Sequence, residues 1–252
     1  RVLQWLEPYG MRLVSIDGGQ RMNAIPSTAH AFIMMPRKYK SESFLASFVE
    51  EIVREHGITD PKNMIAALHL QTGKKNTRVM KLADQHNLLN AISALPNGVL
   101  RVDPANPIFV ETSNNVGVVH TGRKVVTVTC MYRSSRTSQL EYAERVIKSV
   151  FSLGSAKVQL GSRYVAWPPR YDTILLRVAR SVYKAVTGAE AQVLNIHAGL
   201  ECGPISMVWP DAEVISFGPT LQEVHSENER ANIQSVENFW DYLLALLKSE
   251  QL

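Results

Sequence analysis

The residues best suited to chemistry gather in a polar stretch near the end of the chain, SFGPTLQEVHSENER. His225 stands in this stretch among three acidic neighbours, Glu223, Glu227 and Glu229. A neutral imidazole is a common zinc ligand, but a zinc site needs three or four ligands, and the sequence contains neither an HExxH nor a CxxC motif. From the residues alone, His225 is either a metal ligand or a solvated or helix-capping histidine.

A second candidate is the glycine-containing stretch NIHAGLECGPI. Gly199 and Gly203 permit a tight turn and a close approach of a ligand to the main chain, and His197 and Glu201 border that turn. Two interpretations stay open. The stretch is a loop that contacts substrate, or it is a turn after a strand, next to a buried Cys202.

Arg133 and two asparagines could hold a substrate by its polar ends. Arg133 follows an apolar, β-branched run, where a guanidinium can grip a carboxylate through two parallel hydrogen bonds. Asn23 and Asn115 could bind a carbonyl or carboxylate through their amides. The alternatives are a surface arginine at a strand end and asparagines that serve only their turns.

The elements that would position these side chains repeat along the chain. The pattern predicts strand, asparagine-containing loop, strand, helix over residues 12–57 and again over 108–154, with Asn23 and Asn115 in equivalent loops. Helical pieces at 60–71 and 77–94, a turn at LPNG and a loop separate the two copies. Such β-β-α units bury their sheet face by pairing, which favours a duplication over a coincidence of two generic segments.

A third region begins near residue 162. An aromatic, proline-rich linker precedes a predicted amphipathic helix at 173–187, which Gly188 closes. Two short strands, AQVLNIHAG and AEVISFG, and a final helix, VENFWDYLLALLKSE, are expected after it. The pattern is typical of one edge of an α/β sheet whose polar residues lie beyond the strand ends, and it predicts domains at 1–161 and 162–252.

Bulk composition narrows the class of protein. The chain is 45% hydrophobic and 20% charged with a net charge of +4, and its basic residues are scattered, which argues against nucleic acid as a partner. No run of 18 apolar residues predicts a membrane span. Cys130 and Cys202 are interpreted as buried free thiols, which fits a cytoplasmic protein. The chain opens at Arg1 without Met, so we expect it to lie inside a longer polypeptide.

Four blocks together resemble, in order and spacing, the latter half of bacterial aminoacyl-histidine dipeptidases, the peptidase D type. They are GGQRMNAIPSTAHAF, LNAISALPNGVLRVDPANPIFVETSNNVGVV, IHAGLECG and SFGPTLQEVHSENERANIQSVENFWDYLLALL. The resemblance covers nearly the whole chain. The HAGLECG and GPT…HSENER blocks are the most specific parts of it.

The resemblance implies an α/β protein with a duplicated β-β-α lid domain of ferredoxin-like halves, followed by the C-terminal part of a zinc-exopeptidase catalytic domain. It implies two zinc ions that activate a water for attack on dipeptides, preferentially Xaa-His, with a glutamate as general base. Position by position, His225 matches a zinc ligand, and Asn23, Arg133 and Gly199 match residues that hold the dipeptide. Asn115, His197 and Glu201 are added as neighbouring candidates.

The departures from the family pattern limit what this chain can do alone. The family's His-x-Asp block, its Glu-Glu pair with the general base, a further aspartate ligand and a GGHSG-type histidine would all precede Arg1. Met22 stands where the family has arginine, and Glu227 and Asn228 stand where it commonly has Pro-Asp. We therefore expect this chain to need the missing N-terminal part of the same protein as its partner.

Two further expectations concern assembly. The alternative function is a non-catalytic binding or assembly module that lacks most metal ligands. A duplicated lid could replace a dimer partner, although a homodimer through another surface stays compatible with the pattern. The isolated chain is expected to expose apolar surface or to oligomerise, because its last region supplies only part of a sheet.

Overall fold

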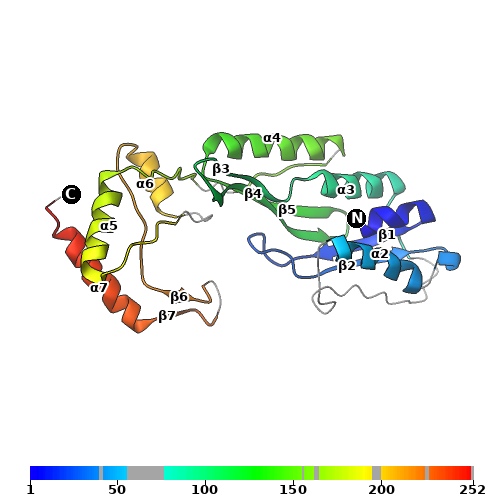
Figure 1. Cartoon of the computed structure of the whole chain (residues 1–252). Coiled ribbons are helices and arrows are strands. Elements are labelled where there is room, and N and C mark those ends of the chain that lie inside the picture. Colours follow the sequence, from blue (N-terminus) through cyan, green and yellow to red (C-terminus); the bar gives the residue numbers. More distant parts are fainter. Residues whose placement is uncertain are drawn as a thin grey trace. The chain divides into compact units, whose positions relative to one another are not determined.

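The computed structural model describes residues 1–39, 42–55, 77–154, 156–161, 165–194, 200–224 and 227–250 (Figure 1). The chain is a mixed α/β protein that divides into two compact units. Unit 1 comprises Arg1–Leu100, Ser113–Tyr132 and Glu141–Leu160, and unit 2 comprises Arg101–Thr112, Arg133–Leu140 and Gly161–Leu252. The helix expected at 60–71 lies outside the described residues.

The strands of the first half form one five-stranded sheet in the order β2-β1-β4-β3, with β5 also paired to β4. They are β1 (Arg12–Gly18), β2 (Ala29–Met34), β3 (Gly98–Asp103), β4 (Asn106–Thr121) and β5 (Val126–Ser134). Strand β1 is antiparallel to β2 on one side and to β4 on the other, where Gly18 faces Val119. The hairpins β1–β2 and β4–β5 thus meet through their first strands.

The expected order of strand, strand and helix is present at both places in the chain. Helix α2 (Glu42–Glu55) follows β2, and α4 (Thr137–Leu153) follows β5. Strand β3 was not predicted, because its residues follow the LPNG turn and are mostly exposed, so they lack the alternation that marks a half-buried strand. The assignment of residues 1–161 as a lid and 162–252 as part of a catalytic domain stays a prediction.

A small core fixes helices against the centre of the sheet in unit 1. Leu6 and Met11, near α1 (Val2–Leu6), are buried together with Leu13 of β1 and Leu89 of α3 (Leu82–Ala94). Two single-turn 3-10 helices, η1 (Glu7–Tyr9) and η2 (Arg37–Tyr39), lie at its edge. Gln85 of α3 is fully buried, and its Oε1 accepts a hydrogen bond from the Leu13 amide at 2.8 Å. This bond satisfies an amide at the β1 bulge that would otherwise be buried without a partner.

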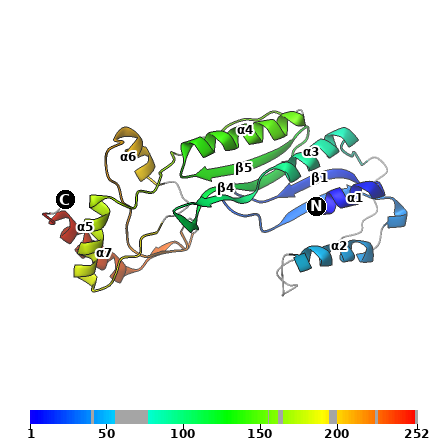
Figure 2. The same cartoon turned by 45° about the horizontal axis from the view of Figure 1, so that its top comes forward.

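Unit 2 is built on two long helices that lie side by side in both views (Figures 1 and 2). Helix α5 (Ile174–Thr187) begins as expected at Thr173, whose Oγ1 accepts the Leu176 amide, and ends at Gly188 with a φ of 74°. Helix α7 (Ile233–Leu247) packs on it through Val178, Ala179, Tyr242 and Leu246. The Tyr242 hydroxyl donates to the Ala179 carbonyl at 3.0 Å, so its polar group is satisfied within the core.

The two strands predicted for the third region show no strand pairing in their described residues. Residues 191–194 and 212–218 carry no strand pairing, because no described segment supplies the neighbouring edge that a strand needs for its hydrogen bonds; residues 195–199 lie outside the description. Glu213 instead accepts the Ile174 and Leu175 amides, at 3.2 and 2.6 Å, and so anchors the start of α5. Within the described part of the chain, no helix has the length and apolar character needed to cross a membrane.

Candidate functional site

Asn23 lies in the exposed loop between β1 and β2, residues 19–28. The Gly19 amide donates to the Thr28 carbonyl at 3.2 Å, which closes the base of the loop. The Ala24 amide donates to the Arg21 carbonyl at 3.3 Å, which makes a turn around Asn23. Residues 20–28 of the loop are exposed, and 88% of the surface of Ile25 is exposed at its tip.

Asn115 lies in the middle of β4 and not in a loop, so the predicted equivalence of its position with that of Asn23 is wrong. Strand β4 runs without interruption from Asn106 to Thr121, and the β-branched valines at 116, 118 and 119 favour this extended backbone. Its side-chain Nδ2 donates to the Met22 carbonyl at 2.8 Å and to the Ala24 carbonyl at 2.7 Å. The structure therefore brings the two predicted asparagines together, with the amide nitrogen of Asn115 bound to the loop that carries Asn23.

Two glycines let this loop lie directly on β4. Gly19 has a φ of +71°, and a Cβ at this position would be 1.8 Å from the Gly117 carbonyl oxygen. A Cβ on Gly117 would be 2.6 Å from the Met22 Cα and carbonyl oxygen. Both positions exclude any side chain, so the backbone of the loop and that of the strand touch.

Arg133 lies near the end of β5, next to a buried polar network. The Ser134 hydroxyl, fully buried, shares a hydrogen bond of 2.9 Å with the Thr112 hydroxyl on β4. The Glu111 carboxylate, 1% exposed, is paired with the Arg101 Nε at 2.7 Å and the Arg136 Nε at 2.8 Å. Both carboxylate oxygens are thereby satisfied, which a buried charge requires.

The network around Glu111 was missed by sequence reasoning. An acidic residue inside an otherwise apolar and β-branched run, PIFVETS, was the available signal, since a buried carboxylate needs cationic partners. Its partners could not be found from spacing, because Arg101 on β3 lies 10 residues away and Arg136, between β5 and α4, lies 25 residues away. The network fixes the strand end from which Arg133 projects.

His225 and Ser226 lie outside the described residues, and the described residues on either side of them form a short hairpin. The hairpin consists of β6 (Leu221–Gln222) and β7 (Arg230–Ala231), which are antiparallel. Arg230 closes its base: its Nε donates to Gln222 at 3.0 Å and its Nη1 to Glu223 at 2.7 Å. Glu223 has a left-handed backbone, with a φ of 53°, which turns the chain into the loop.

The hairpin is continuous with the start of α7. The Asn232 amide donates to the Thr220 carbonyl at 3.0 Å, and its Oδ1 accepts the Ser235 amide at 2.9 Å as a helix cap. The Ser235 hydroxyl in turn accepts the Thr220 amide at 2.9 Å. The residues before and after the His225 loop are thus fixed to one helix end.

Of the glycine-containing stretch, His197 and Gly199 lie outside the described residues, while Glu201 is exposed at the start of α6 (Cys202–Val208). Gly203, for which a ligand contact and a plain turn were both left open, faces the backbone: a Cβ there would be 2.6 Å from the Val165 carbonyl oxygen. The described structure therefore explains this glycine by helix packing.

Both cysteines are free thiols, as expected. Cys202 is buried and Cys130 is partly buried. Burial raises the pKa of each thiol above its ordinary value, because it disfavours the thiolate. Both thiols are therefore protonated, and poor nucleophiles, at neutral pH.

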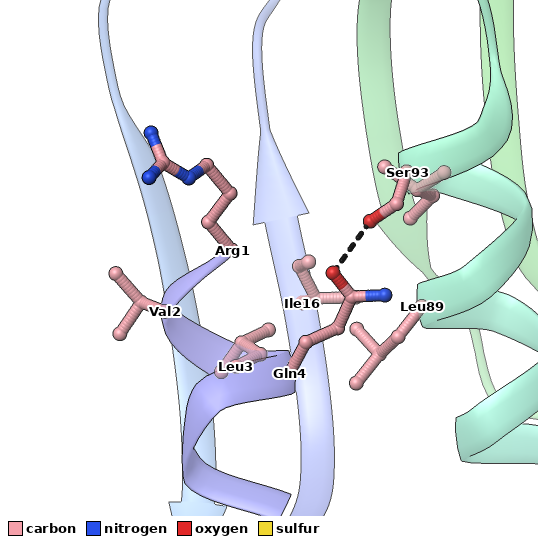
Figure 3. A pocket seen from close by; sticks show the side chains of 8 residues that line it. Arg1, Val2, Leu3, Gln4, Ile16, Leu89 and Ser93 are labelled. Carbon is pink, nitrogen blue, oxygen red and sulfur yellow. Dashed lines mark hydrogen bonds between the residues drawn. The ribbon is translucent and has the colours of Figure 1, made fainter. Parts of the chain in front are cut away.

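Among the residues that the structure describes, no three histidine, cysteine or acidic side chains are grouped so that they could hold a metal ion. A shallow hollow of about 250 Å³ lies in unit 1 between α1, β1 and α3, where the Ser93 hydroxyl donates to Gln4 Oε1 at 2.7 Å (Figure 3). Its lining is mostly apolar and contains none of the predicted site residues.

Comparison with known proteins shows similarity in sequence and in fold to dipeptidases. The chain is 32% identical to the protein in the crystal structure of aminoacylhistidine dipeptidase from Vibrio alginolyticus, with a TM-score of 0.85 over 98% of this chain. The chain is thus similar to half of an aminoacylhistidine dipeptidase. It is also 31% identical, over 243 residues, to the cytosol non-specific dipeptidase of Escherichia coli (strain K12). No family model matches the sequence.

The chain spans half the length of each of these dipeptidases. The matches cover 96% and 98% of the chain, so both units take part in the relationship and neither is an unrelated addition. The expectation that this sequence corresponds to part of such a dipeptidase is therefore confirmed.

Proposed function

We propose that the full-length protein containing this chain is a zinc-dependent dipeptidase with a preference for Xaa-His dipeptides. The observation that carries the proposal is the match of nearly the whole chain, in sequence and in fold, to an aminoacylhistidine dipeptidase. The E. coli relative is named a cytosol non-specific dipeptidase, which supports peptide hydrolysis and a cytoplasmic location.

In this proposal the chain binds the dipeptide, and the catalytic base comes from outside it. Asn23 and the backbone at Gly199 orient the substrate, and Arg133 binds its free carboxylate as a charge-assisted pair. The buried network at Glu111 supports this role, because it holds the strand end next to Arg133 rigid. His197 and Glu201 are assigned as neighbours of the substrate.

His225 is assigned as one zinc ligand. Of the two described carboxylates that lie two residues from His225, Glu223 is engaged by Arg230 at 2.7 Å and so is a poor second ligand. The described residues of this chain do not make a zinc site on their own, and the remaining ligands are assigned to the part of the protein outside this chain. In this proposal the chain contributes one imidazole, that of His225, to the zinc site.

The test is His225→Ala in the full-length protein. We expect bound zinc to decrease and hydrolysis of Xaa-His dipeptides to fall by at least about 100-fold, since metal-activated water is lost with its ligand set. Metal content by mass spectrometry of the native protein and steady-state kinetics measure the two effects.

His86→Ala is the matched control, because His86 is a partly exposed histidine on α3 that pairs with Glu7 at 3.1 Å. It should retain zinc and activity. Full zinc content and full activity in His225→Ala would refute the assignment. Absence of any dipeptide hydrolysis by the unmodified full-length protein would favour the non-catalytic binding module instead.

A further inference from the structure

The loop that carries Asn23 lies in solvent along its length. Its residues 20–28 are all exposed, and two internal backbone bonds, at Gly19 and Ala24, shape it. An exposed loop samples several conformations unless another element holds it. A side chain that must orient a substrate needs the opposite, since misplacement by about 1 Å can cost as much as 100-fold in rate.

Asn115 provides that hold from the neighbouring strand. A primary amide has two N–H groups, and the Nδ2 atom of Asn115 lies 2.8 Å from the Met22 carbonyl and 2.7 Å from the Ala24 carbonyl. These two carbonyls belong to the residues immediately before and after Asn23. The backbone on both sides of Asn23 is therefore bound to a single side chain.

Glycine at positions 19 and 117 allows the Asn115 side chain to reach the Met22 and Ala24 carbonyls. A methyl group at either position would overlap backbone atoms of the other segment, at 1.8 Å and 2.6 Å respectively. Any such overlap would push the loop away from β4 and lengthen both hydrogen bonds that the Asn115 side chain donates. We name Asn115, Gly19 and Gly117 the loop clamp.

We propose that the loop clamp positions Asn23 for substrate binding, with Asn115 as a positioning residue that does not itself touch the dipeptide. The proposal rests on the substrate-binding role given to Asn23 above. It replaces the expectation that Asn115 binds substrate, because both donors of its amide are used within the protein. Asn115 then affects turnover only through Asn23.

A double-mutant cycle on the full-length protein tests this relation. Asn115→Ala is expected to lower kcat/KM for an Xaa-His dipeptide by roughly 10-fold. Asn23→Ala should lower it by at least as much. If Asn115 acts through Asn23, the double variant should be no more than about twofold worse than Asn23→Ala alone, because a residue that is already absent cannot be misplaced.

Asn97→Ala is the matched control. Asn97 Oδ1 accepts the Val116 amide at 2.9 Å, so this variant removes an asparagine bond from the same part of β4 without touching the loop. Its kcat/KM should stay within about twofold of the unmodified protein. A loss equal to that of Asn115→Ala would assign the effect to general disturbance of β4 and overturn the proposal.

Hydrogen exchange of the loop amides gives a readout that needs no substrate. Asn115→Ala should accelerate exchange of residues 21–25 by roughly 10-fold, while Asn97→Ala should not. Unchanged exchange would overturn the clamp itself, whatever the kinetics show.

Accelerated exchange with full activity in Asn23→Ala would instead overturn the substrate-binding role of Asn23, and with it the positioning role of Asn115. Additive losses in the double variant would show that Asn115 acts independently of Asn23.

Discussion

The loop that carries Asn23 and the hairpin that carries His225 are held in opposite ways. Asn115 reaches the loop from a strand that lies 93 and 91 residues further along the chain than the two carbonyls it binds. Arg230 closes the hairpin through partners only 8 and 7 residues away. The first geometry exists only when the sheet is assembled, whereas the second is encoded within a dozen residues.

This difference predicts which substitutions should disturb each site. The Asn23 loop depends on a close fit between two backbones, so small changes at the contact should have large effects. The hairpin depends on exposed polar bonds, which contribute little to the free energy of unfolding. Substitutions in the hairpin should therefore change zinc binding more than they change the free energy of unfolding.

The largest expected effect is that of Gly19→Ala. The added Cβ would require a left-handed backbone for alanine and a backbone contact of 1.8 Å, so we expect a loss of roughly 2–4 kcal/mol in the free energy of unfolding of unit 1. Gly98→Ala is the control, because Gly98 has a φ of +87° but no neighbouring atom within 4 Å. It should cost only about 1 kcal/mol. Equal losses by denaturant unfolding would contradict the close fit of loop and strand.

A smaller, more local effect is expected for Arg230→Ala in the full-length protein. Removal of the closing bonds should lower zinc affinity by about 10-fold, as is typical when a group that orients a metal ligand is lost. The free energy of unfolding should change by less than about 1 kcal/mol. Arg180→Ala, on the exposed side of α5, should change neither quantity. A chelator competition assay measures the affinity, and an unchanged value would show that the hairpin keeps its shape without Arg230.

The smallest effect is expected for Glu213→Gln, which tests a long-range anchor inside unit 2. The Leu175 amide, with the Ile174 amide, lowers the pKa of the Glu213 carboxyl below its ordinary value of 4.5 by hydrogen bonding. Its contribution to stability is therefore present above pH 4.5 and is lost as the pH falls through the lower folded pKa. The unmodified protein should melt slightly higher than Glu213→Gln at neutral pH, and the two curves should converge in acid. A difference that persists in acid would contradict this origin.

Local chemistry allowed much of the fold to be predicted from the sequence. Helix α5 begins within one residue of the predicted 173–187 range and ends at Gly188 as expected, since a left-handed glycine acts within one turn of the helix. The two strand-strand-helix segments were also found, because each alternates or repeats its apolar residues over many positions. What failed depended on distant neighbours: β3 pairs despite an exposed pattern, and residues 212–218 are unpaired despite an apolar one.

The candidate site shows the same limit. His225, Arg133 and Asn23 were selected by residue type and by family resemblance. Each of these two criteria can be read from the residue and its immediate neighbours in the sequence. Asn115 was selected for its amide but given the wrong place, because nothing local distinguishes a strand asparagine that binds a distant loop from a loop asparagine. Arg230 and Glu111 were missed, since an arginine or a glutamate in isolation does not show which partner it will bind.

The exposed tip of the Asn23 loop also offers a place for a reporter group. Both native thiols are held in their protonated form by burial, so they react slowly with maleimides and similar reagents. A cysteine introduced at Ile25, where 88% of the surface is exposed, would be the fastest-reacting thiol on the chain. A fluorophore or spin label attached two residues from Asn23 would then follow the loop in solution.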